Sequence, residues 1–217
     1  MSLAIFDLDN TLLQGDSDHA WGEFLCEQGI VDAAEYSQKN DYFFKQYQKG
    51  TLDIHEFLEF ALRPLAELPA DRLAELHTQF MHVKVESMIL NKALALLQKH
   101  RDQGDFLLII TATNHFVTAP IAARLGVDAI LATDPEMVDG CYTGKVAGTP
   151  CFQSGKVTRL NQWLKETKHS LQGSSFYSDS RNDLPLLELV DYPVAVDADE
   201  SLTLTAKQKG WPIISLR

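Results

Sequence analysis

Residues 3–13 read LAIFDLDNTLL, and this stretch indicates the fold because four apolar residues run into a pair of aspartates. A short apolar run followed by a turn with Asn and Thr is typical of a buried strand that ends in a polar loop. The pattern recurs where residues 106–110 run into Thr111, residues 174–177 into Ser178 and Asp179, and residues 193–196 into Asp197. Each predicted strand therefore ends on a polar residue.

Helical patterns separate these strands. Apolar residues at spacings of three and four predict helices over Met88–His100, Phe116–Leu125 and Lys156–Lys168. Alternating strands and helices predict an α/β fold, with a Rossmann-like parallel sheet covered by helices on both faces. In such sheets ligands bind outside the carboxyl ends of the strands, so we expect the polar residues at those ends to form a site.

Residues 15–83 do not fit the alternation, because they read as helices without a strand. We expect an all-α cap domain at 15–83, inserted into a core domain formed by 1–14 and 84–217. A tight hairpin is predicted around Val138–Tyr142, from its Asp-Gly pair. The cap helices are predicted at 17–28, 33–48, 54–62 and 70–83, with breaks at Gly29, at Gly50-Thr51 and between Pro64 and Pro69.

The composition restricts the partners of this 217-residue chain. Its net charge of −11 argues against binding to nucleic acid or to anionic lipid. No apolar run reaches the roughly 18 to 20 residues of a membrane span, and no secretory leader is evident, so we expect a cytoplasmic protein. If such an acidic protein binds a negatively charged ligand, it needs local positive charge from a metal or from basic side chains.

Asp7 and Asp9 are the first candidates for chemistry. Two carboxylates two residues apart after a strand can act as a nucleophile and as a general acid and base, if a cation offsets their repulsion. The alternative is a turn with solvated aspartates, since Asp and Asn are common in turns. A calcium loop is excluded, because Leu12 stands where that loop needs glycine.

Thr111 and Lys156 come at a predicted strand end and a predicted helix start. A hydroxyl and the backbone N–H groups at a helix start can hold phosphate oxygens, although Thr113 or Asn114 can equally be an ordinary helix cap. A lysine is disfavoured at a helix N-terminus, where the dipole repels cations. Lys156 therefore suggests a nearby anion, either a carboxylate or a substrate phosphate.

Asp179 and Asp183 complete the set. Asp179, at a strand end, can bind a hard cation, and Asp183, about one helical turn later, can orient a water molecule or hold Lys156. The alternative is a polar loop with a capping aspartate. The balance favours a site because all these residues follow strands of one predicted sheet.

Together these residues resemble the motifs of the haloacid dehalogenase-like hydrolase superfamily. The match spans nearly the whole chain in the family's order. A helical insertion directly after the first motif is similar to the phosphoserine phosphatase-like branch, subfamily IB. The stretches 144–156 and 177–188 look closest to a bacterial histidinol-phosphatase-like group. The matching motifs are Asp7 to Thr11, Thr111, Lys156, and Asp179 with Asp183.

The resemblance implies a Mg²⁺-dependent phosphatase in which Asp7 becomes an aspartyl phosphate. Asp9 protonates the leaving alcohol and then activates water, while Thr111 and Lys156 bind the phosphoryl oxygens. Mg²⁺ is expected on the Asp7 carboxylate, the backbone carbonyl of Asp9, and Asp179, with Asp183 and Asn182 behind these residues and Thr113 and Asn114 near the substrate.

Substrate choice is expected to come from the cap. Asp16, Asp18 and His19 lie near the start of the first cap helix with Trp21, and Glu59 and Arg63 lie on a later one; each is also explained as a helix cap, a core residue or a solvated face. Phosphoserine phosphatases carry a cap arginine that pairs with the substrate carboxylate, and our rough alignment places Glu59 there. An amine or imidazolium substrate such as histidinol phosphate is then favoured, unless Arg63 serves instead.

Rival functions stay open. A phosphoserine phosphatase is one alternative, and a phosphotransferase would pass the same phosphoryl group to an acceptor other than water. A binding protein on an inactive scaffold is disfavoured, because no motif position is missing. The partner is expected to be a small phosphate ester, with no nucleic acid and no membrane, while the sequence does not determine the oligomeric state.

Overall fold

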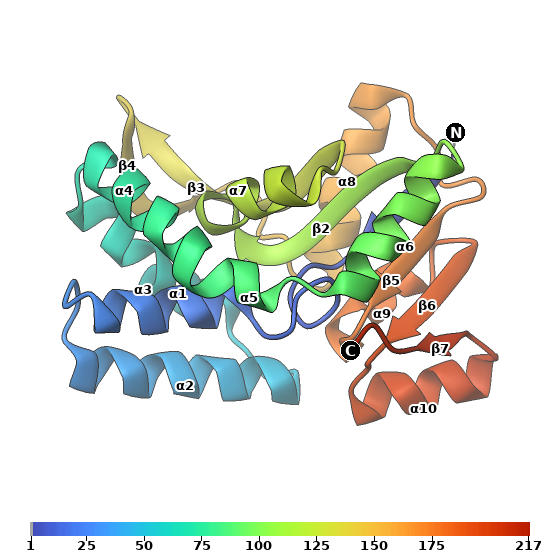
Figure 1. The fold of residues 1–217 in the computed structure, drawn as a ribbon, viewed down its shortest axis with the longest axis horizontal. Coiled ribbons are helices and arrows are strands. Elements are labelled where there is room, and N and C mark those ends of the chain that lie inside the picture. Colours follow the sequence, from blue (N-terminus) through green and yellow to red (C-terminus); the bar gives the residue numbers. More distant parts are fainter. Residues whose placement is uncertain (1) are drawn as a thin grey trace.

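The computed structural model describes residues 2–217 (Figure 1). Its centre is a seven-stranded sheet in the order β4-β3-β2-β1-β5-β6-β7. All neighbouring strands are parallel except β3 and β4. The predicted parallel sheet is therefore confirmed, with an antiparallel hairpin at one edge. The strands are β1 (Leu3–Phe6), β2 (Phe106–Asn114), β3 (Ala129–Val138), β4 (Cys141–Ala147), β5 (Ser175–Ser178), β6 (Tyr192–Val196) and β7 (Ile213–Ile214).

Helices cover both faces of the sheet, as expected for nearly continuous apolar strands. Alternate residues of β1 point to opposite faces: Ala4 and Phe6 belong to one buried cluster, and Leu3 and Ile5 to another. The first face is covered by α1 (Ser17–Glu27), α4 (Ala70–Phe80), α6 (Asn91–Asp102) and α7 (His115–Leu125), and the second by α8 (Ser154–Thr167), α9 (Leu184–Leu187) and α10 (Glu200–Lys209).

The chain between β1 and β2 is helical, and we call α1 to α4 the helical segment. Figure 1 shows it at one end of the molecule with the β3–β4 hairpin, while β5 to β7 and α10 lie at the other end. The predicted starts of its helices are confirmed, and Asp16, Asp32 and Asp53 cap the first three. Its other two helices are α2 (Ala33–Lys49) and α3 (Ile54–Glu67).

Several predicted boundaries are wrong. Strand β2 continues past Thr111 to Asn114, so Thr111 lies within the strand and not after its end, and α8 begins two residues before Lys156. Helix α3 continues through Pro64, because burial of Leu62 and Leu65 offsets the hydrogen bond that proline removes near the helix end. Helix α4 passes into a π-helix, η1 (Met81–Val85), and then α5 (Glu86–Met88). The helix expected from Met88 begins at Asn91, because Ile89 leaves the helix to form a bridge with Leu13.

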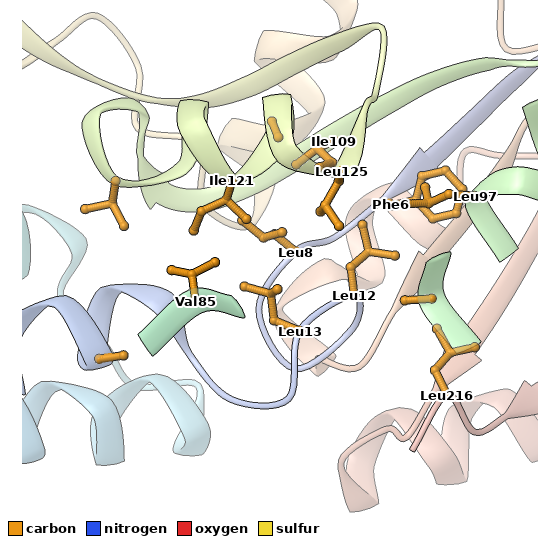
Figure 2. Close-up of a cluster of buried hydrophobic side chains, with 14 of the residues drawn as sticks. Phe6, Leu8, Leu12, Leu13, Val85, Leu97, Ile109, Ile121, Leu125 and Leu216 are labelled. Atoms are coloured by element: carbon orange, nitrogen blue, oxygen red, sulfur yellow. The ribbon is translucent and has the colours of Figure 1, made fainter. Parts of the chain in front are cut away.

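The two connections between the helical segment and the sheet lie side by side. The backbone N–H of Gln14 donates to the carbonyl of Met88 at 2.7 Å. Around this crossing Leu8, Leu12 and Leu13 pack with Val85 of η1 and Ile121 of α7 (Figure 2). The loop after β1 is thus anchored in the core by leucines, which fixes the backbone that carries Asp9.

The predicted hairpin is confirmed, with both turn residues, Asp139 and Gly140, at positive φ. It is longer than expected, and β4 packs against α3. Gly144, beside Arg63 of α3, has φ +78°, a backbone conformation that favours glycine. Within residues 2–217, none of the helices combines the length and the apolar character needed to cross a bilayer.

Candidate active site

Asp7 lies at the carboxyl end of β1, where its N–H extends the sheet by donating to the carbonyl of Tyr177 at 2.9 Å. Its carboxylate is buried, with 2 % exposure. Burial, more than the lowering effect of Lys156, sets its pKa, which rises from 3.8 to about 7. One oxygen, Oδ1, accepts from Lys156, and the other, Oδ2, has no hydrogen-bond partner among the described residues. Asp7 therefore offers one unpaired, buried oxygen.

Lys156 reaches Asp7 from the first turn of α8. Its Nζ donates to Asp7 Oδ1 and to Asp183 Oδ2, both at 2.8 Å. Burial alone lowers the pKa of Lys156, but the two carboxylates outweigh it and raise the pKa well above the usual range. The expectation that this lysine faces an anion is confirmed.

The turn before Lys156 explains how the side chain reaches the site. Gln153, at the helix start, has φ +48° and ψ −119°, an unusual conformation for a residue with a side chain. A Cβ on Gly155 would lie 2.0 Å from the carbonyl oxygen of Pro150, so only glycine fits there. This tight turn aims Lys156 at Asp7.

Asp9 is held by donors from two different parts of the chain. Its Oδ1 accepts from the backbone N–H of Ser17 at 2.6 Å, and its Oδ2 accepts from the Thr113 hydroxyl at 2.8 Å. Thr111 lies 3.5 Å from the same oxygen. Burial and the negative charge of Asp16 raise the pKa of Asp9 to about 7. Near neutral pH such a group can both donate and accept a proton.

The residues present fit a divalent cation. Asp179 follows β5 and is half-buried, with its Oδ1 accepting from Thr11 at 3.1 Å. Burial first, and then the charges of Asp7 and Asp183, raise its pKa. The unpaired Asp7 Oδ2 and clustered carboxylates are the donor set that a hard cation balances. Among residues 2–217, no three His, Cys, Asp or Glu side chains form a metal cluster, so a cation here would also need backbone oxygen or water as ligands.

Asp183 and Asn182 have different roles in the structure. Asp183 binds Lys156 and accepts from Ser178 Oγ at 2.7 Å, as expected for a residue behind the site. Among the described residues, the Asn182 side chain makes no hydrogen bond to Lys156 or to an aspartate. Its Oδ1 accepts from Gln153 at 3.1 Å, and its Nδ2 donates to the carbonyl of Tyr47 at 3.2 Å, so it connects the α8 turn to α2.

A cavity opens over Asp7, Asp9 and Thr111. Asp16 and Asp18 line it, and Asp16 also caps α1 by accepting from the N–H groups of Asp18 and His19. Burial raises the pKa of both Asp16 and Asp18. Asn114 caps α7 and lies near Asp18, 3.4 Å from Nδ2 to Oδ1. The cavity is lined by Asp7, Asp9, Asp16, Asp18, His19, Asn40, Phe43, Phe44, Tyr47, Leu52, Ile54, Phe57, Thr111, Ala112 and Thr113.

Glu59 and Arg63 are not brought to this cavity, which corrects the expectation for both. Both are exposed on α3, and Arg63 lies 3.8 Å from Glu67 on the same helix. Helix α3 turns Leu58 and Leu62 inward, so residues 59 and 63 face outward. Trp21 is a core residue, at 2 % exposure. The position of Glu59 therefore does not indicate the charge of the substrate.

Sequence reasoning missed one wall of the cavity, which α2 supplies. Asn40, Phe43, Phe44 and Tyr47 follow helical spacing and face one side of α2. The aromatic periodicity was a usable signal, but the same spacing is typical of a core stripe. Only the packing of α2 over Asp7 distinguishes a cavity wall from a core.

Comparisons with known proteins agree with this geometry. Residues 4–188 match the family model of the haloacid dehalogenase-like hydrolases. The chain is 48 % identical over 220 residues to a histidinol-phosphatase of Neisseria meningitidis serogroup C, covering 100 % of this chain and 99 % of the relative. It is 30 % identical over 217 residues to a phosphoserine phosphatase of Mycobacterium tuberculosis, covering 99 % of this chain and 70 % of the relative.

Solved structures support the same fold. A protein of unknown function from Bordetella pertussis Tohama I has a TM-score of 0.94 at 43 % identity, covering 100 % of this chain and 99 % of that one. A phosphoserine phosphatase solved as a phospho-aspartyl intermediate analogue has a TM-score of 0.72 at 18 % identity, and the match covers 100 % of this chain and 93 % of that one. The predicted family is thus confirmed: the chain belongs to the haloacid dehalogenase-like hydrolases.

Proposed function

We propose that this phosphatase hydrolyses a small phosphate monoester that carries a cationic amine or imidazolium group, with histidinol phosphate as the candidate substrate. The observation that carries the proposal is the cavity itself. Asp7, with one unpaired oxygen, forms its floor, and Asp16 and Asp18 form an acidic part of its wall. A phosphate above Asp7 and a cation beside Asp18 fit this arrangement.

The reaction has two displacements. Asp7 attacks phosphorus, so an Asp7–phosphorus bond forms while the ester oxygen leaves and takes the proton of Asp9. Asp9 then accepts a proton from water as the water oxygen attacks phosphorus, and the Asp7–phosphorus bond breaks to release inorganic phosphate. Lys156 holds Asp7 and the phosphoryl oxygens. The pKa of Asp9, about 7, suits both proton transfers.

Mg²⁺ is the proposed cofactor. The Asp7 carboxylate, the backbone carbonyl of Asp9 and Asp179 are the groups that would hold it, with water as the remaining ligands. When bound, it supplies positive charge that offsets the carboxylates and the phosphate. Thr11 contributes by fixing Asp179 through two contacts, since its hydroxyl donates to Asp179 Oδ1 and accepts from the Asp179 N–H, each at 3.1 Å.

The chemistry of the cavity wall favours a cation over a carboxylate. Among the described residues that line it there is no Lys or Arg. His19 is the basic residue there, but its Nε2 lies 3.0 Å from Asp41. A substrate carboxylate, as in phosphoserine, would face Asp16 and Asp18 without a paired cation, which costs free energy. An amine or imidazolium would be paired there.

We also propose that residues 15–83 act as a cap domain over a core of 1–14 and 84–217. The α1–α2 wall encloses the cavity, and enclosure excludes water from the phosphoryl group. The two adjacent crossings at Gln14 and Met88 offer a short connection about which the cap can move relative to the sheet.

The test is phosphate release by the wild type and Asp7→Asn, with and without Mg²⁺, on histidinol phosphate, phosphoserine, sugar phosphates and nucleotides. We expect Mg²⁺-dependent hydrolysis of histidinol phosphate, lost in Asp7→Asn. Higher kcat/KM for phosphoserine would overturn the substrate assignment. Transfer of the phosphoryl group to an added alcohol, without free phosphate, would identify a phosphotransferase.

Asp18→Asn tests the cation-binding wall, with Glu59→Gln as the matched control. Both variants remove one negative charge from the helical segment, but Glu59 is exposed and outside the cavity. We expect Asp18→Asn to raise KM for histidinol phosphate by about tenfold, as for a lost charge-assisted hydrogen bond, while Glu59→Gln matches the wild type. Equal KM values for all three proteins would refute the role of Asp18.

A further inference from the structure

Tyr47 is a half-buried residue of α2 that lies beside the carboxylates of the site. It lines the same cavity as Asp7, Asp9 and Thr111. Burial is the main cause of a pKa well above the usual value, followed by the charges of Asp7 and Asp179, so the phenol stays protonated and remains a donor. Among the described residues its hydroxyl makes no hydrogen bond, although four carboxylates influence it.

The backbone around Tyr47 is held in place from the sheet side. Asn182 Nδ2 donates to the Tyr47 carbonyl at 3.2 Å, and Asn182 stands next to Asp183 in η2 (Arg181–Asp183). Gly50 ends α2 at φ +72°, where a Cβ would lie 3.2 Å from Arg181 Nε. The C-terminal end of α2 therefore rests on the loop that carries Asp179 and Asp183.

The ring of Tyr47 is also positioned from a second loop. Its centroid lies 6.1 Å from that of Phe152, which precedes the turn that aims Lys156. Asn182 joins these loops by accepting from Gln153 at 3.1 Å. Tyr47 is thus oriented by both of the segments that carry the Lys156–Asp183 pair, and its side chain lines the cavity.

We propose that Tyr47 is a catalytic residue whose hydroxyl donates a hydrogen bond to an oxygen of the substrate phosphoryl group. The proposal rests on the proposed function, since it requires a phosphate above Asp7. It makes phosphoryl transfer depend on the seating of α2 over the sheet, because this donor comes from the helical segment whereas Asp7 and Lys156 come from the sheet side. A preorganised donor aimed at developing negative charge lowers the reaction barrier.

The test compares Tyr47→Phe with Tyr42→Phe, which removes the same hydroxyl from the same helix at a side chain that is 50 % exposed. The readouts are kcat/KM for the best substrate and, independently, the affinity for inorganic phosphate with Mg²⁺ measured by calorimetry. We expect Tyr47→Phe to lower kcat/KM by roughly 10- to 100-fold and to weaken phosphate binding by about tenfold, at an unchanged melting temperature. Tyr42→Phe should match the wild type.

Wild-type phosphate affinity in Tyr47→Phe overturns the proposal, whatever happens to turnover. Failure of the proposed function is separable, because it would appear as a wild type that hydrolyses none of the phosphate esters. The phosphate-binding comparison would still decide whether the hydroxyl of Tyr47 contacts the anion.

Discussion

The backbone N–H of Ser17 donates to Asp9 Oδ1 at 2.6 Å, which joins the first residue of α1 directly to a carboxylate at the carboxyl edge of the sheet. Asp16, the residue before it, caps the same helix and lines the cavity. The start of the helical segment thus contacts both the acid–base candidate and the substrate space. Displacement of α1 would remove one of the two donors that hold the Asp9 carboxylate.

Asp9→Asn tests the acid–base role. We expect kcat for an alkyl phosphate to fall by at least about 10². p-Nitrophenyl phosphate has a leaving group that needs no proton, so its first displacement should persist in Asp9→Asn as a burst of nitrophenol in rapid mixing. A variant that lacks the burst, or that turns over alkyl phosphate normally, contradicts the role.

Lys156→Met tests the buried ion pairs. It leaves Asp7 and Asp183 buried without a counter-charge, so we expect a loss of about 3–5 kcal/mol in the free energy of unfolding. Urea unfolding of the metal-free protein at pH 8 measures it. Adding Asp183→Asn to Lys156→Met should recover part of the stability but no activity. An unchanged urea midpoint in the single variant would show that the pairs contribute little.

Gly155→Ala tests the turn that aims Lys156. Its Cβ would clash with the Pro150 carbonyl at 2.0 Å, which forces the backbone to move. We expect a destabilisation of about 1–3 kcal/mol and a marked loss of kcat. Ser154→Ala, at the exposed neighbouring position, is the control and should change neither. Melting temperature and turnover are the measurements, and a fully active Gly155→Ala would disprove the need for glycine.

Magnesium should stabilise the protein more at pH 8 than at pH 5. Burial raises the pKa of Asp7 and of Asp9 from 3.8 to about 7, so the metal-free fold loses stability as the pH rises from about 4 to 7. Bound Mg²⁺ favours the deprotonated carboxylates and reverses this trend. At a hundredfold excess over Kd the gain is about 2.7 kcal/mol. Differential scanning fluorimetry measures it, and a gain that is larger at pH 5 would contradict the site.

His77 should make stability fall in mild acid. It is buried between Trp21 and Phe116, with Nε2 2.9 Å from the Val117 carbonyl. Burial lowers its pKa below 6.5, so the unfolded chain binds the proton first. The resulting loss of folding stability is absent above about pH 6.5 and grows as the pH falls below this value. The urea midpoint of His77→Phe should depend less on pH in this range than that of the exposed-site control His82→Phe; equal slopes would exclude His77.

Much of the fold was predictable from local pattern. Apolar runs that end in polar residues identified β1, β2, β5 and β6, because buried parallel strands must be apolar throughout. The boundaries that failed depend on contacts made at a distance: Pro64 stays helical because Leu62 and Leu65 are buried, and Ile89 leaves the helix to pair with Leu13. The β3–β4 hairpin is longer than predicted because β4 packs against α3, which lies far from it in the chain.

The sequence by itself determined the chemistry at the sheet edge. Asp7 and Asp179 follow strands, Thr111 lies in the last half of β2 and Lys156 in the first turn of α8. Parallel topology brings such ends together whatever the details of packing. Only the tertiary structure decided the substrate wall. Glu59 lies outside the cavity and Tyr47 lines it, because the side chains that α3 and α2 bury fix which face of each helix is turned toward the cavity. Helical periodicity identifies an apolar face, but the partner that this face meets is set by contacts between residues far apart in the chain.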